Sequence, residues 1–189
     1  MAALTCALKE WEIAVEALLQ GELILLLRKG GIRETQGRFQ VQSDNVALFP
    51  TLEHQQPECL KLPWRDRAIT TTSPSQSDWV TFTGWAEITE LIPLRDPTLV
   101  ARLTPFHLWT EAWAMERLAW KPQQPLLALC LRAYRFPEPH RIDYQTHFGG
   151  CRSWLDLAPT LNAHGSQPAL NATAYGEQVA AIKTVLGII

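Results

Sequence analysis

The first part of the chain changes from helix-like to strand-like spacing of its apolar residues. In residues 7–20 the apolar positions 8, 11, 15, 18 and 19 follow a 3.6-residue period, and Gly21 stands where a helix commonly ends. Five consecutive apolar residues follow at 23–27, too few for a helix of their own. We therefore predict an amphipathic helix over 7–20, a buried strand over 23–27 and a return strand after a Gly-Gly turn.

The middle of the chain alternates a polar segment with long apolar ones. Residues 65–78 nearly lack large apolar side chains and are expected to form a mobile surface loop. Residues 79–94 are rich in β-branched and aromatic side chains, which predicts a long strand bent at Gly84. The same signals predict strands over 46–49, 125–136 and 152–157, a short helix that begins at Asp96-Pro97, and a second helix over 110–118.

Composition changes after residue 157. Residues 158–174 are rich in Pro, Asn, Gly and Ser without an apolar period, which predicts a linker. Residues 175–189 have helical spacing and are expected to form a terminal helix that docks on the body or on a protein partner. Residues 1–157 are expected to form one α+β domain, with a mainly antiparallel, partly closed barrel or sheet and flanking helices.

The overall composition is typical of a globular protein. The chain has 189 residues, of which 47% are apolar and 19% charged, with a formal net charge of −2. Eight Trp and six Phe exclude disorder as a general description. No apolar run approaches the roughly 20 residues that a bilayer requires, and charges at 9, 10, 12 and 16 interrupt any signal peptide. We expect no membrane association and a cytoplasmic location.

Positive charge gathers around one pair of glycines. Backbone N–H groups of adjacent glycines can approach an anion closely, and flanking Arg and Lys add charge and donors. A phosphate site is therefore predicted here, although a basic hairpin tip without a ligand fits the same pattern. The basic turn, as we name this set, comprises Arg28, Lys29, Gly30, Gly31, Arg33 and Arg38.

Two of the tryptophans are candidates for stacking on a base. Trp64 and Trp120 each adjoin a proline and a basic residue, whereas most others lie inside apolar patterns typical of a core. Aromatic faces stack on nucleobases, and nearby cations strengthen the contact.

Histidine and cysteine positions allow two further hypotheses. His54, Cys59, His147 and Cys151 could close a tetrahedral zinc site, although neither pair has a typical zinc-ligand spacing. Cys151 follows two glycines and could act as a nucleophile if a histidine such as His107 or His147 took its proton. The alternative is that these residues occupy loops and the core, and no cofactor or catalytic residue is predicted.

A metal-dependent nuclease of the PD-(D/E)xK type is a further alternative, because a helix followed by strands is similar to the opening of that fold. The acid-x-Lys element is missing at every lysine, and only Glu53, with Asp44 upstream, imitates a degenerate variant.

Four motifs carry a resemblance to a known family. LLRKGGIRE, LFPTLEHQ, the stretch from Leu103 to Phe136 and FGGCRSW together resemble an uncharacterised bacterial family, a domain of unknown function found largely in cyanobacteria. The resemblance covers about residues 7–157. It implies a cyanobacterial setting and no chemistry.

The order of predicted elements is also similar to the small barrels of the PUA, ASCH and EVE group, which bind RNA or modified bases. Function is thus predicted as a non-catalytic module that binds an anionic ligand, namely RNA, DNA or a nucleotide phosphate, at the basic turn. The alternatives are the nuclease and a protein scaffold that engages a partner through the terminal helix.

Overall fold

The computed structural model describes residues 3–29, 40–70 and 78–188. These residues form one seven-stranded sheet in the order β2-β5-β4-β3-β1-β6, with β7 paired to β5. The strands are β1 (Ala3–Trp11), β2 (Leu25–Arg28), β3 (Asn45–Thr51), β4 (Trp79–Leu94), β5 (Leu126–Asp143), β6 (Trp154–Asn162) and β7 (Gln167–Pro168). The α-helices are α1 (Glu12–Gln20), α2 (Trp64–Thr70), α3 (Pro97–Arg102), α4 (Glu111–Ala119) and α5 (Ala172–Leu186). Short 3₁₀ turns are η2 (Pro57–Cys59), η3 (Thr104–Phe106) and η4 (Thr146–Phe148).

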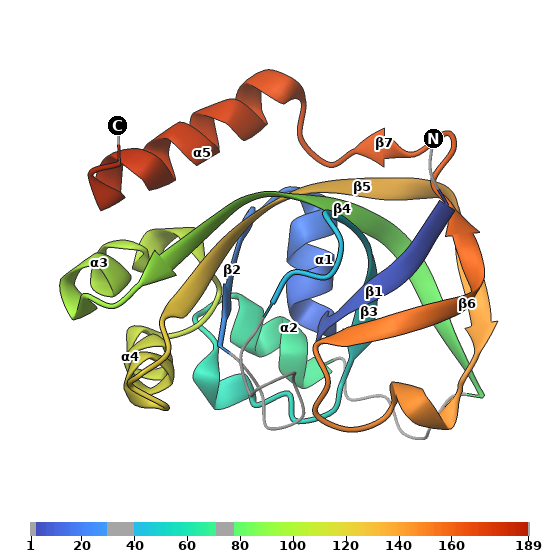
Figure 1. The fold of residues 1–189 in the computed structure, drawn as a ribbon, viewed down its shortest axis with the longest axis horizontal. Coiled ribbons are helices and arrows are strands. Elements are labelled where there is room, and N and C mark those ends of the chain that lie inside the picture. The colour runs from blue at the N-terminus through green and yellow to red at the C-terminus, as the bar shows by residue number, and fades with distance from the viewer. Residues whose placement is uncertain (1–2, 30–39, 71–77, 189) are drawn as a thin grey trace.

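The predicted α+β class with a mainly antiparallel sheet is confirmed. Among the pairings of described strands, only β1 with β3 is parallel. The sheet curves strongly, and α3, α4 and α5 lie toward its left-hand side in Figure 1. It is not closed into a barrel, because β2 and β6 remain edge strands.

Several predicted elements are confirmed with their boundary signals. Gly21 adopts a left-handed conformation (φ 73°) and ends α1. The side chain of Asp96 caps α3 by accepting from the Thr98 N–H at 2.8 Å. The register of β4 shifts between Phe82 and Gly84, at the predicted bend. A Cβ at Gly84 would overlap the Leu19 side chain, so this position requires glycine.

The predicted helix over 7–20 is wrong for its first five residues. Residues 7–11 belong to β1, which lies between β3 and β6 and is buried on both faces. A strand buried on both faces lacks polar alternation, so its apolar residues could also satisfy a helical period. The strand predicted at 23–27 is confirmed as β2, whereas most of the predicted return strand lies outside the described residues.

The predicted loop over 65–78 is wrong at its start, because residues 65–70 belong to α2. Residues 71–77 lie outside the described part of the chain. The α2 segment contains few apolar residues. Trp64, at its start, nevertheless packs against the main core.

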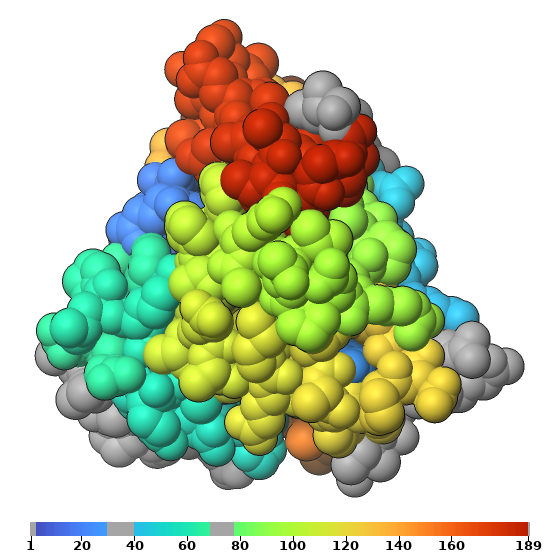
Figure 2. All heavy atoms as spheres, turned by 90° about the vertical axis from the view of Figure 1, so that its left-hand side faces the viewer, coloured from blue at the N-terminus to red at the C-terminus, as the bar shows by residue number. Residues whose placement is uncertain are grey.

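The predicted linker over 158–174 also contains regular structure. Residues 158–162 complete β6, and β7 pairs with β5 before α5 begins. The apolar side of α5 then packs on the body through Tyr175, Ile182 and Leu186, all buried. Figure 2 shows α5 seated against α3, where Arg102 donates to the Val185 carbonyl at 3.4 Å. The apolar side of α5 is therefore covered by the body of the protein and is not exposed to a protein partner.

Candidate ligand-binding pocket

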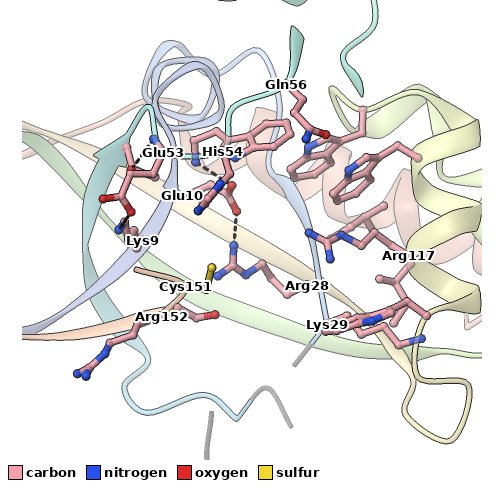
Figure 3. A pocket seen from close by; sticks show the side chains of 18 of the residues that line it. Lys9, Glu10, Arg28, Lys29, Glu53, His54, Gln56, Arg117, Cys151 and Arg152 are labelled. Atoms are coloured by element: carbon pink, nitrogen blue, oxygen red, sulfur yellow. Dashed lines mark hydrogen bonds and ion pairs between the residues drawn. The ribbon is translucent and has the colours of Figure 1, made fainter. Parts of the chain in front are cut away.

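A pocket of about 360 Å³ lies where β1 and β3 end. Because these two strands are parallel, their carboxyl ends meet at the same edge of the sheet. The end of β2, one side of α4 and the loop before β6 complete the walls (Figure 3). The pocket therefore combines segments that are far apart in the sequence.

Lys9 is a buried charge at one side of the pocket. Its Nζ donates to Glu53 Oε2 at 2.6 Å and to the carbonyls of Phe148 at 2.9 Å and Gly150 at 3.2 Å. An ammonium group has three donors, and these contacts use all of them. Lys9 thus fixes the loop before β6 against the end of β3.

Glu10, the next residue of β1, forms a more deeply buried ion pair. Its Oε2 accepts from Arg28 at 2.7 Å, and its Oε1 accepts from the Trp11 N–H at 2.8 Å. Arg28 ends β2, and three strands separate β2 from β1 in the sheet. The curvature of the sheet is therefore what brings these two charges together.

The structure describes only two residues of the predicted basic turn, Arg28 and Lys29, and both line the pocket. Lys29 Nζ donates to the Leu118 carbonyl at 2.6 Å. Burial and the nearby positive charge of Arg95 lower the pKa of the Lys29 ammonium. Both cations thus make internal contacts instead of projecting from an exposed hairpin tip. Gly30, Gly31, Arg33 and Arg38 lie outside the described residues.

Four tryptophans line the pocket, and we call them the aromatic wall: Trp11, Trp109, Trp113 and Trp120. The rings of Trp109 and Trp113 are stacked with centroids 4.7 Å apart, and Trp11 lies 6.4 Å from Trp113. Trp109 is held by a bridge to Leu60. The Thr110 side chain caps α4, which carries Trp113.

The two predicted stacking residues have different positions. Trp120 lies in the pocket with Arg28 and Lys29, and the Lys121 ammonium lies 4.5 Å from its ring centroid. Trp64 does not line the pocket, and its Nε1 donates to Glu22 at 2.9 Å.

Sequence reasoning missed Arg117, which belongs to the same wall. Its guanidinium carbon lies 5.2 Å from the Trp113 ring centroid and 5.7 Å from that of Trp120. Positions 113, 117 and 120 are separated by four and three residues, which places their side chains on one face of a helix and its C-terminal extension. That spacing was a signal in the sequence that could have identified Arg117.

Backbone conformation also marks this region. Two non-glycine residues of the described chain have positive φ, His54 at 59° and Lys121 at 48°. His54 lines the pocket and Lys121 follows Trp120. Left-handed conformations of such residues are uncommon and concentrate at functional sites.

The zinc hypothesis is not supported by the geometry. No group of three or more His, Cys, Asp or Glu residues suited to a metal occurs within the described ranges. His54 and Cys151 both line the pocket, but Cys59 contacts Gln56 and His147 contacts the Asp156 carbonyl. The four residues therefore do not form one ligand set.

The described residues do not support either catalytic alternative. Asp44 and Glu53 flank opposite ends of the seven-residue β3, roughly 20 Å apart, so they cannot share a metal ion. Cys151 is exposed and lines the pocket. Of its two proposed bases, His107 is fully buried in the core, and the His147 ring contacts the Asp156 carbonyl at 3.3 Å.

The fold and pocket define an α+β protein with a cationic, tryptophan-lined cavity. Residues 7–181 match the profile of the family described as "Domain of unknown function (DUF1802)", and the chain belongs to that family. The match extends the resemblance seen in the sequence motifs into α5. The cyanobacterial setting and the cytoplasmic location stay predictions.

Solved structures of an ASCH protein are similar to this chain. The ASCH structure from Zymomonas mobilis is 13% identical, covers 93% of this chain and 93% of that chain, and has a TM-score of 0.46. A mutant of the same protein is 12% identical, covers 93% and 94%, and has the same TM-score. This agrees with the predicted resemblance to the ASCH group, but a likeness this distant carries no argument about function. No match was found among curated proteins, and none of the described helices is long and apolar enough to cross a membrane.

Proposed function

We propose that the pocket binds an anionic ligand that carries a planar ring, namely a nucleotide or a residue of RNA or DNA, and that the protein is a binding module. The observation that carries this proposal is the joint presence of cations and indoles in one cavity. Five basic side chains line it, Lys9, Arg28, Lys29, Arg117 and Arg152, against the two acids Glu10 and Glu53. Both acids are paired with pocket cations, so positive charge remains in excess.

The charge of the whole chain supports a local site. Nonspecific nucleic-acid affinity comes from a broad basic surface that displaces counterions, and the net charge here is −2. Affinity is therefore expected to depend on the pocket, with indoles that supply stacking and cations that supply the contact with phosphate.

Replacing Trp120 with alanine is expected to weaken binding of a short single-stranded RNA by about tenfold, since stacking on an aromatic side chain contributes about 1–3 kcal/mol per base. The measurement is fluorescence anisotropy of a labelled oligonucleotide at low salt. Trp79→Ala is the matched control, because Trp79 is exposed and does not line the pocket.

If the Trp120→Ala variant binds RNA with the same affinity as the wild type, Trp120 does not contact the ligand and the aromatic wall is not part of the binding site. If the wild-type protein binds no RNA, single-stranded DNA or nucleotide at low salt, the proposed function is wrong.

A further inference from the structure

The cations of the pocket differ in whether they have a partner inside the protein. Lys9 donates to a carboxylate and two carbonyls, Arg28 is paired with Glu10, and Lys29 donates to the Leu118 carbonyl. Arg117, by contrast, makes ring contacts with Trp113 and Trp120 and no hydrogen bond or ion pair with any residue in the described ranges. Its N–H donors are therefore available to a ligand without breaking an internal contact.

Arg117 is also held in place before any ligand arrives. The Trp113 and Trp120 rings lie 5.2 Å and 5.7 Å from its guanidinium carbon, and both attract a cation. In Figure 3 the guanidinium groups of Arg117 and Arg28 extend into the same space, from α4 and β2 respectively. A guanidinium that is already oriented loses less conformational freedom when it binds an anion.

We infer that Arg117 is the residue that binds the ligand's phosphate, and that the ligand is a single nucleotide, with its base against the aromatic wall. This inference rests on the proposed function. The planar guanidinium group of arginine binds a phosphate through two parallel hydrogen bonds, which are stronger and more specific than a single hydrogen bond. Arg28, by contrast, is paired with Glu10, which compensates its charge within the protein.

The volume of the pocket favours a small ligand. Its volume of about 360 Å³ is near the lower end of the roughly 300–1,000 Å³ typical of small-molecule sites. That volume is of the size needed for one small ligand such as a nucleotide. Arg152 also lines the pocket, but in Figure 3 its guanidinium points away from Arg117.

The test combines two variants with three probes in isothermal titration calorimetry. The probes are adenosine monophosphate, adenosine, which lacks the phosphate, and ribose 5-phosphate, which lacks the base. We expect Arg117→Gln to weaken adenosine monophosphate and ribose 5-phosphate binding by at least about tenfold and to leave adenosine unchanged. Arg117→Lys keeps the charge without the planar guanidinium group and is expected to recover only part of the loss.

The matched control is Arg141→Gln, because Arg141 also lies over an indole, that of Trp79 at 5.6 Å, outside the pocket. It is expected to bind all three probes like the wild type. Thermal unfolding confirms that each variant is folded, as expected for substitutions of exposed side chains.

The outcomes separate this inference from the proposed function. If Arg117→Gln binds adenosine monophosphate like the wild type, or weakens adenosine equally, Arg117 is not the phosphate ligand, although the pocket can still be the site. If the wild type binds an oligonucleotide but not adenosine monophosphate, the single-nucleotide class is wrong and the proposed function stands. If the wild type binds neither, both are wrong.

Discussion

Replacing Arg28 with alanine is expected to lower the free energy of unfolding by about 3–5 kcal/mol, because it removes one partner of a buried ion pair. Glu10 is only 5% exposed and would remain as an uncompensated carboxylate. The sequence alone placed Arg28 at an exposed hairpin tip, where the same substitution would cost little. Urea unfolding of the two proteins measures the difference directly.

Two further variants give this prediction its controls. Adding Glu10→Gln to Arg28→Ala removes the unpaired charge but keeps an acceptor for the Trp11 N–H, so it should recover a large part of the loss. Arg67→Ala breaks the more exposed pairs with Glu16 and Glu22 and should cost about 1 kcal/mol or less. An Arg28→Ala variant no less stable than Arg67→Ala would show that the buried pair does not support the fold.

Acidification from pH 6.5 to about 4 is expected to cost about 3 kcal/mol of stability through His107 alone. Burial, and then the positive charge of Lys61, lower the pKa of the His107 imidazole to about 4. The unfolded chain takes up a proton near pH 6.5, whereas the folded protein does so only near pH 4. The stability that the folded protein gains from a neutral His107 is therefore fully present above pH 6.5 and is lost as the pH falls from 6.5 to about 4.

His107→Leu isolates this effect. The imidazole is fully buried, and neither of its nitrogens has a hydrogen bond of normal geometry within the described residues, so an apolar side chain leaves no polar partner behind. Urea unfolding at several pH values should show a shallower loss in the variant. His164→Leu, at an exposed position, should keep the wild-type dependence. Parallel curves for wild type and His107→Leu would contradict the assignment.

Elements with strong local signals could be predicted from the sequence. Asp96 caps α3 and Gly21 ends α1 through contacts within a few residues, so their patterns are informative without knowledge of the fold. The strand β1 could not be recognised because its burial on both faces depends on β3 and β6, which are distant in the chain. The same holds for α2, whose few apolar side chains are stabilised by the core beneath them.

The candidate site could be predicted only in part, for the same reason. Arg28, Lys29 and Trp120 were identified from their chemistry, and they do lie in one pocket. Their partners could not be identified, because Lys9 meets the Gly150 carbonyl across 141 positions of sequence. Without those partners, the sequence could not show that Arg28 and Lys29 are already engaged and that Arg117 is not.

A nucleotide-like ligand is expected to occupy the tryptophan-lined pocket. Each of the eight tryptophans has one indole N–H, so a proton–nitrogen NMR spectrum reports on them separately once Trp→Phe variants assign the signals. Titration with adenosine monophosphate is expected to shift the signals of the aromatic wall and to leave the other four unchanged. Binding in this pocket would be contradicted if no signal shifted at any concentration, or if the shifts were confined to the other four residues, Trp64, Trp79, Trp85 and Trp154.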